Sequence, residues 1–194
     1  MKRILSLICL CLAFLSVSAQ KYTEDDVKQF YRALEGNYHG LTNDSVPFSL
    51  HLTPIWEREN DRFHWLYLEA VNNETQAVIE QKILEIKPLS DITFKLIVHG
   101  IRHPEQFVGK WGNRNYFDGF NTSILKGSSK IMFLKTKDFE YQTNWNGRKS
   151  LKCFPKGDRI HFKCSLDDER IYVKRVPART SDIKGIVFFK DQTD

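Results

Sequence analysis

From residue 37 onward the hydrophobic pattern of this chain has a period of two, and no other feature constrains its fold as much. Short runs of β-branched and aromatic residues are separated by turn-forming residues, for example at 72–75 and 88–91. This alternation is typical of antiparallel strands joined by tight turns. We therefore predict ten strands, at residues 45–52, 63–71, 77–86, 92–99, 130–136, 139–144, 150–153, 159–164, 170–176 and 185–189. Ten strands around one core imply a barrel or a sandwich, because an open sheet of that size would leave costly edges.

Residues 23–36 carry the one strong helix signal. Thr23 can cap a helix, because Asp26 follows it at the third helical position, and Gly36 is a typical helix stop. Between them, apolar residues recur at helical spacing: Val27, Phe30, Tyr31 and Leu34. We predict a short N-terminal helix with one apolar face packed on the sheet.

The first 19 residues have the pattern of a secretory signal peptide. Two basic residues precede an apolar run, and Val17 and Ala19 supply the small side chains that signal peptidase requires. We expect cleavage after Ala19, which gives a secreted or periplasmic protein with a single domain over residues 20–194. A domain of this length buries enough surface to fold without a disulfide or a metal.

Charge and hydropathy exclude two classes of partner. The leader removes two positive charges, so the formal net charge falls from +5 to +3 (5 − 2), and acids and bases alternate in the remainder. This distribution argues against a nucleic-acid partner. After the leader, no apolar run approaches the roughly 18 residues of a membrane helix, so we also predict no membrane span.

The sequence lacks the common metal and catalytic motifs. Its six histidines do not form the two paired sets of cysteine or histidine ligands that a structural zinc site needs. The nucleophile elbow of hydrolases, the phosphate-binding glycine loop and the dinucleotide fingerprint are also missing. We predict no metal site and no required cofactor, and whether the chain is an enzyme stays open at this point.

Two cysteines, Cys153 and Cys164, remain after the leader, in a compartment that favours disulfides. A tight turn at residues 155–158 would place Cys153 opposite Ile160 and about 13 Å from Cys164 along the strand. A disulfide then requires a bulge or a different strand pairing. A Cys153–Cys164 bridge and a pair of buried thiols are the two alternatives.

The strand at residues 63–71 carries the clearest candidate site. Alternation places Trp65, Tyr67 and Glu69 on one face, and antiparallel pairing with the next strand brings Gln81 into the same layer. Aromatic side chains with a few convergent polar groups are typical of a ligand cavity inside a barrel. The alternative is that this is the outer face of the barrel, with Glu69 in solvent.

Residues 102–129 have no clear period and predict a long loop with one or two short helical turns. Its cations Arg102, Lys110 and Arg114 could pair with an anionic ligand. Its aromatic residues could form either a lid over an open end of the barrel or a plug at its base: Trp111, Tyr116, Phe117 and Phe120.

The order and spacing of four short pieces resemble the CpeT/CpcT family of bilin (chromophore) lyases. The pieces are Trp65-Leu66-Tyr67-Leu68-Glu69, Ile79-Glu80-Gln81-Lys82-Ile83-Leu84, Glu105-Gln106-Phe107-Val108-Gly109 and the stretch at residues 147–153. The resemblance extends over roughly residues 27–176.

This resemblance implies a calycin-like, lipocalin-like antiparallel barrel that holds a linear tetrapyrrole and presents it to a cysteine of an acceptor protein. Tyr67, Glu69, Gln81 and Lys82 match the family's polar barrel positions. Glu69 would be the catalytic acid or the acceptor for a pyrrole nitrogen, and Lys82 the partner of a propionate. Because alternation places Lys82 on the face opposite Gln81, one of those two assignments fails.

Three hypotheses follow from these observations. The first is an exported barrel that binds a small, largely apolar ligand, tetrapyrrole-like or unknown, through Trp65, Tyr67, Glu69, Gln81 and Lys82. The second is an active chromophore lyase that attaches a bilin to a cysteine of an acceptor protein. The third is a secreted interaction domain whose barrel is filled with side chains.

Overall fold

The computed structural model describes residues 22–41, 46–56, 64–143, 161–167, 169–176 and 185–191. Within these ranges the chain forms one α-helix, four short 3-10 helices and ten strands. In chain order they are α2 (Glu24–Leu34), β1 (Gly36–Leu41), β2 (Pro47–Pro54), β3 (Trp65–Asn72), β4 (Val78–Pro88), β5 (Thr93–Ile101), η1 (Pro104–Phe107), η2 (Lys110–Gly112), η3 (Arg114–Gly119), η4 (Thr122–Ile124), β6 (Leu125–Lys137), β7 (Glu140–Thr143), β8 (His161–Leu166), β9 (Arg170–Val176) and β10 (Gly185–Lys190). None of the helices in these ranges has the length and apolar character needed to cross a membrane.

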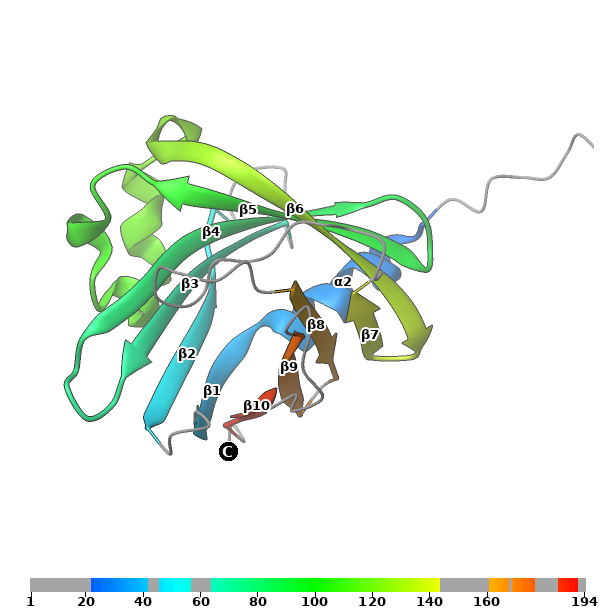
Figure 1. Ribbon diagram of the computed structural model, residues 1–194. Coiled ribbons are helices and arrows are strands. Elements are labelled where there is room, and N and C mark those ends of the chain that lie inside the picture. The colour runs from blue at the N-terminus through cyan, green and yellow to red at the C-terminus, as the bar shows by residue number, and fades with distance from the viewer. Residues whose placement is uncertain are drawn as a thin grey trace, which may run out of the picture.

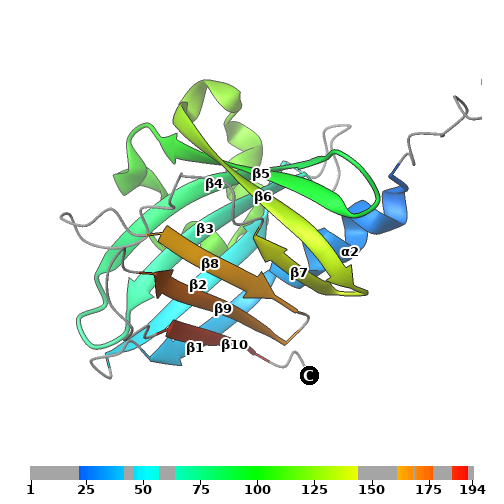
Figure 2. The same cartoon turned by 45° about the vertical axis from the view of Figure 1, so that its right-hand side comes forward.

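The ten strands pair in a closed antiparallel barrel (Figures 1 and 2). Strands that are consecutive in the chain are neighbours, and the ring closes where β1 pairs with β10. Two seams are short, because β7 and β8 share two residue pairs and β1 and β10 share three. The predicted mainly β fold, a single antiparallel barrel of about ten strands with a short N-terminal helix, is confirmed and is consistent with a calycin-like architecture.

Strand β1 was not among the predicted strands. The helix ends at Leu34, Glu35 is already extended, and Gly36 begins the strand. Of the six strand residues only Tyr38 is buried, so β1 has no alternating apolar pattern to reveal it. The predicted strand at residues 150–153 lies outside the described residues. The disulfide question lies outside them too, because it depends on Cys153.

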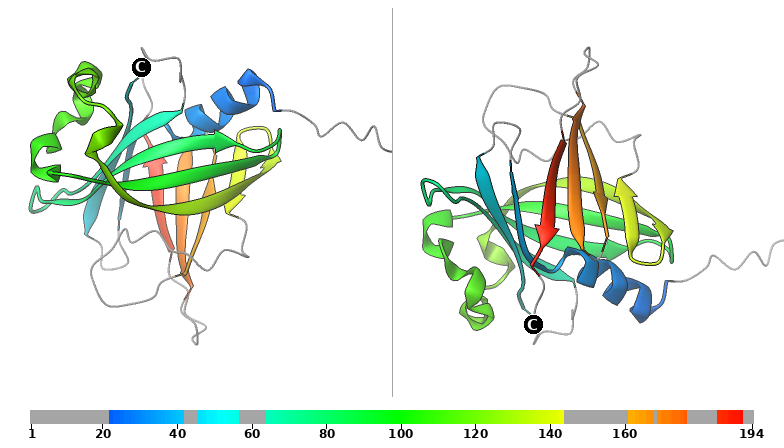
Figure 3. Two further views of the ribbon diagram at one scale, coloured as in Figure 1. Left: turned by 90° about the horizontal axis from the view of Figure 1, so that it is seen from above. Right: turned by 90° about the horizontal axis from the view of Figure 1, so that it is seen from below.

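Helix α2 begins with the predicted capping box. The Thr23 hydroxyl accepts a hydrogen bond from the Asp26 backbone N–H at 3.2 Å, and the Asp26 carboxylate accepts one from the Thr23 backbone N–H at 2.9 Å. These bonds satisfy backbone donors at the helix start. The helix lies on the concave side of the curled sheet (Figure 3), where Lys135 of β6 approaches Asp26 to 3.8 Å.

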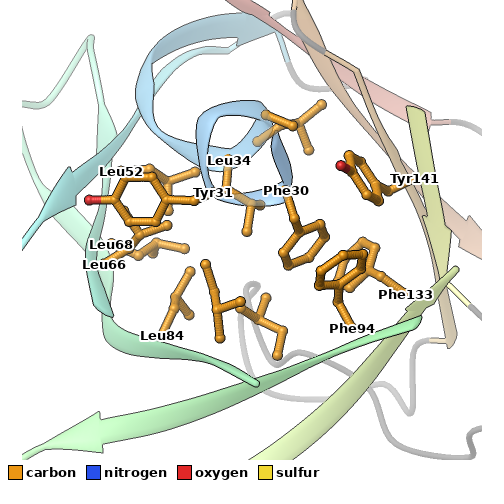
Figure 4. Close-up of a cluster of buried hydrophobic side chains, with 14 of the residues drawn as sticks. Phe30, Tyr31, Leu34, Leu52, Leu66, Leu68, Leu84, Phe94, Phe133 and Tyr141 are labelled. Atoms are coloured by element: carbon orange, nitrogen blue, oxygen red, sulfur yellow. The ribbon is translucent and has the colours of Figure 1, made fainter. Parts of the chain in front are cut away.

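The apolar face of α2 fills the described part of the barrel interior (Figure 4). The Phe30 ring stacks on Phe94 with 4.6 Å between ring centroids and meets Tyr141 edge-on at 4.8 Å. Tyr38 of β1 donates a hydrogen bond to the Ala33 carbonyl at 2.8 Å, which ties the helix end to the first strand. Among the described side chains, this interior cluster includes residues from nine strands, as only residues that face the inside of a closed ring can.

A second apolar cluster lies on the outer face of the barrel. Tyr67 of β3 and Ile83 of β4 belong to it, whereas their strand neighbours Leu66 and Leu84 belong to the interior cluster. The outer cluster is covered by residues 102–124, which contain η1–η4 and which we call the cap segment. The cap segment lies beside the outer side of β3 and β4 in Figures 1 and 3.

Candidate functional site

Three of the five predicted site residues lie in contact with one another. Tyr67 and Glu69 share the outer face of β3, and Gln81 of β4 lies directly opposite Glu69. The Gln81 amide donates to the Tyr67 hydroxyl at 2.7 Å and to Glu69 Oε2 at 3.2 Å. Strand alternation and antiparallel pairing therefore placed these three residues together correctly.

Their orientation relative to the barrel was predicted wrongly. Trp65, Tyr67 and Glu69 were expected to face an internal cavity, but Leu66 and Leu68 occupy the interior and the trio faces outward. The alternative, an outer face with Glu69 in solvent, is correct only about the face. Glu69 is 1% exposed, because the cap segment lies over it.

Glu69 is bonded to the cap segment as well as to the sheet. The backbone N–H of Gly109 donates to both carboxylate oxygens, at 3.1 and 3.0 Å. The Tyr67 hydroxyl lies 2.7 Å from Glu69 Oε2 and 2.9 Å from the Phe107 carbonyl oxygen, so its single proton is donated to one of these two acceptors. The carboxylate thus accepts hydrogen bonds from the Gly109 backbone and the Gln81 amide, and the Tyr67 hydroxyl is a third donor within bonding distance.

Burial, hydrogen bonds and the charge of Glu69 together determine the electrostatics of this cluster. Within the described part of the chain, Glu69 forms no salt bridge, and its polar contacts are all with neutral hydrogen-bond donors. Burial raises the pKa of Tyr67 well above its usual range, and the hydrogen bond to Glu69 and the charge of Glu69 raise it further. Tyr67 therefore stays protonated at physiological pH and remains a hydrogen-bond donor.

Trp65 and Lys82 lie away from this cluster. Trp65 packs edge-on against Trp56 with 5.1 Å between ring centroids, and lies 5.8 Å from His99. Lys82 lies on the face of β4 opposite to that of Gln81, as strand alternation predicts, and forms a salt bridge with Glu80. Lys82 therefore does not belong to the cluster that Gln81 forms with Tyr67 and Glu69.

The aromatic segment forms neither a lid over the barrel opening nor a plug at its base. It packs on the outer face of the sheet, where Phe117 lies 4.8 Å from Tyr67 and stacks on Phe107 at 5.6 Å. The Trp56 indole N–H, from the end of β2, donates to the Phe117 carbonyl at 2.9 Å. Four 3-10 helices replace the one or two helical turns predicted for this segment.

His51 and Trp111 form a contact that sequence reasoning missed. Their rings stack with 3.7 Å between centroids and an interplanar angle of 2°. Thr53 of the same strand donates to the Trp111 carbonyl at 2.8 Å, and His51 Nδ1 lies 2.9 Å from Asn37 Oδ1. Burial lowers the pKa of His51, against the opposing effect of the Glu69 carboxylate.

A groove of about 910 Å³ opens beside Trp111, between the end of α2, strands β1 and β2, and the cap segment. Its wall combines aromatic, cationic and anionic side chains: Trp111, Phe139, Arg32, Arg114, Lys190 and Glu35. A smaller pocket of about 240 Å³ lies next to Gln81, where β4 and β5 separate. Only the larger of these two has the volume of a typical small-molecule site.

The predicted cations of the cap segment have different surroundings. Arg114 forms a 2.9 Å ion pair with Glu35 at the groove, whereas Lys110 lies 5.1 Å from the centre of the Tyr116 ring. Arg102 donates to the Leu125 carbonyl at 3.4 Å. Of the three, Arg114 is the one that lines the groove.

No protein-family model matches the chain, and no curated protein matches it either. Among the described residues there is no group of three histidine, cysteine, aspartate or glutamate side chains that could hold a metal ion. The groove and the polar cluster under the cap segment are the two candidate sites among the described residues.

Proposed function

We propose that this chain is an exported small-molecule-binding barrel whose ligand lies in the groove at the end of α2 and not in the barrel interior. The observation that carries the proposal is the groove itself, about 910 Å³ in volume, with a fixed tryptophan and three cations in its wall. Ligand sites of 300–1,000 Å³ usually combine apolar surface with a few polar groups.

The aromatic wall favours a flat, largely apolar ligand. Trp111 is held by the His51 ring and by the hydrogen bond from Thr53, so it offers a surface that loses little conformational freedom on binding. Phe139 adds apolar area elsewhere along the groove.

The charges of the groove favour an acidic group on that ligand. Three cations, Arg32, Arg114 and Lys190, face two carboxylates, Glu35 and Asp191. Glu35 is paired with Arg114, and Asp191 lies 2.6 Å from His39. Arg32 is exposed and forms no ion pair with the residues that the structure describes, so its guanidinium is available to a ligand carboxylate.

A linear tetrapyrrole belongs to this ligand class, because it is a conjugated molecule with two propionates. The resemblance to CpeT/CpcT chromophore lyases supports it as the first ligand to test. The proposal does not extend to bilin transfer, since Glu69, the candidate acid, is 1% exposed and already has three hydrogen-bond donors within bonding distance.

The test is a titration with two probes, biliverdin followed by its visible absorption and anilinonaphthalene sulfonate followed by its fluorescence. We expect both to bind, Trp111→Leu to abolish most of the binding, and Arg32→Gln to weaken it about tenfold, which corresponds to loss of roughly 1.4 kcal/mol. Lys28→Gln is the matched control, because Lys28 lies one turn earlier on α2 and outside the groove.

Each failure of this test has a separate meaning. Binding of the sulfonate without biliverdin would retain the groove and exclude tetrapyrroles. Wild-type affinity in both groove variants would place the site elsewhere. No binding of either probe would contradict the proposal and leave the interaction domain as the alternative. A covalent adduct with an added acceptor thiol would restore the lyase hypothesis.

A further inference from the structure

A row of polar residues crosses the outer face of the sheet beneath the cap segment. Asn37, His51, Glu69 and Gln81 occupy directly opposite positions on β1, β2, β3 and β4. Cross-strand neighbours at such positions are close enough to interact. The row therefore presents four adjacent hydrogen-bonding side chains to whatever lies over the sheet.

The cap segment is attached to this part of the sheet at three alternate residues. The Phe107 carbonyl lies 2.9 Å from the Tyr67 hydroxyl, and the Gly109 N–H donates to Glu69. Trp111 is held through its carbonyl by Thr53 and through its ring by His51. The contact of Glu69 with Gly109 is the central one of the three, and Glu69 is 1% exposed.

A carboxylate suits this position because all of its partners are donors. Gly109 supplies a backbone N–H, Gln81 an amide N–H and Tyr67 a hydroxyl. A glutamine at residue 69 would have the same size, but one of its two terminal atoms would be an NH₂ group. Because the Gly109 N–H contacts both carboxylate oxygens, that NH₂ group would oppose a donor in either orientation.

We propose that Glu69 is a positioning residue that fastens the cap segment to the sheet and thereby fixes the Trp111 wall of the ligand groove. This proposal rests on the proposed function for its effect on binding, but not for its effect on the cap segment. Glu69 itself is not among the residues that line the groove. Its influence reaches the ligand through Lys110, the single residue that separates Gly109 from Trp111.

The first measurement is backbone hydrogen exchange in peptides that cover residues 103–117. Glu69→Gln should accelerate exchange at Gly109 and Trp111 at least tenfold and leave the β4 and β5 peptides unchanged. Glu105→Gln is the matched control, because Glu105 belongs to the cap segment but is 69% exposed and contacts His103. A merely destabilised barrel would instead accelerate exchange in all strands.

The second measurement is the affinity of the same variants for biliverdin and anilinonaphthalene sulfonate. Glu69→Gln should weaken binding five- to tenfold, and Glu105→Gln should not change it. If the wild type binds neither probe, the proposed function fails, while the exchange experiment still decides whether Glu69 fastens the cap segment.

Two results would overturn the positioning role. One is wild-type exchange at Gly109 and Trp111 in Glu69→Gln, and the other is accelerated exchange with wild-type affinity for a bound probe. If Glu69→Gln does not fold, Gln81→Met replaces it, because this change removes the amide that donates to Glu69 Oε2 and Gln81 does not line the groove. It should accelerate exchange next to Trp111 and weaken probe binding in the same direction, and failure to do both would count equally against the proposal.

Discussion

Burial under the cap segment alters the protonation behaviour of His51. His51 of β2 stacks on Trp111 and lies opposite Glu69 of the neighbouring strand β3, on the same face of the sheet. Burial disfavours its charged form and lowers its pKa, while Glu69 and Asp191 act in the opposite direction. Because the net effect is a lowered pKa, the folded state with the cap segment in place favours the neutral imidazole of His51.

The lowered pKa of His51 predicts a loss of stability on mild acidification. The unfolded chain binds this proton near pH 6.5, before the folded chain does, so the stabilisation is present above about pH 6.5 and is lost as the pH falls toward the folded-state pKa. We expect His51→Phe, which keeps an aromatic ring against Trp111, to reduce the drop in Tm between about pH 7.5 and 5.5.

The control for this prediction is His103→Asn. His103 is 74% exposed, lies at φ 53, where asparagine is tolerated, and should leave the drop in Tm unchanged. An equal acid response in the wild type and His51→Phe would contradict the assignment.

At the level of secondary structure, contacts at both ends of α2 stabilise this helix. The capping box fixes its start, and Tyr38 of β1 bonds to the Ala33 carbonyl near its last turn. The Asp26 carboxylate also faces Lys135 of β6 at 3.8 Å, so the cap is a tertiary contact as well. The hydrogen bond from the Thr23 backbone is the main reason why the pKa of Asp26 is lowered.

Asp26→Asn should lower the free energy of unfolding by about 1 kcal/mol at neutral pH. Because the folded-state pKa of Asp26 lies below its unfolded value, this stabilisation is present above about pH 4 and is lost as the pH falls through the folded-state pKa. Urea unfolding at pH 7 and near pH 2 should therefore show a difference from the wild type only at pH 7. Asp25→Asn, at a neighbouring residue that is 85% exposed, should change little at either pH.

At the scale of the whole molecule, α2 packs against three consecutive strands of the barrel. Phe30 contacts Phe94 of β5, Phe133 of β6 and Tyr141 of β7 within one aromatic group. Removal of the Phe30 side chain would therefore eliminate aromatic contacts with three strands of the barrel.

Phe30→Ala should therefore destabilise the protein by about 3–5 kcal/mol, the usual range for a fully buried phenylalanine. Chemical denaturation should show a lower midpoint with one cooperative transition. Phe189→Ala, at an outward residue of β10 that is 51% exposed, should cost less than about 1 kcal/mol. Similar losses in the two variants would mean that α2 is not central to the barrel.

The sequence predicted the elements better than their mutual arrangement. Capping and helical spacing identified α2, because these signals are local. Strand β1 was missed, because Gly36, Asn37 and Gly40 are not residues typical of strands. Alternation correctly grouped Tyr67 with Glu69, yet it could not say which face of β3 was enclosed. Both faces are buried, one around α2 and one under the cap segment, and only long-range packing separates them.

The pairing of β1 with β10 also bears on how the chain folds. Tyr38 lies opposite Lys190, so the two strands that complete the ring are separated by nearly the whole described chain. During synthesis one edge of β1 stays unpaired until β10 leaves the ribosome. Such distant contacts slow folding and leave an edge open to aggregation. A chain shortened before residue 185 would keep two permanently unpaired edges, so we expect it to depend on chaperones or to form amyloid-like aggregates.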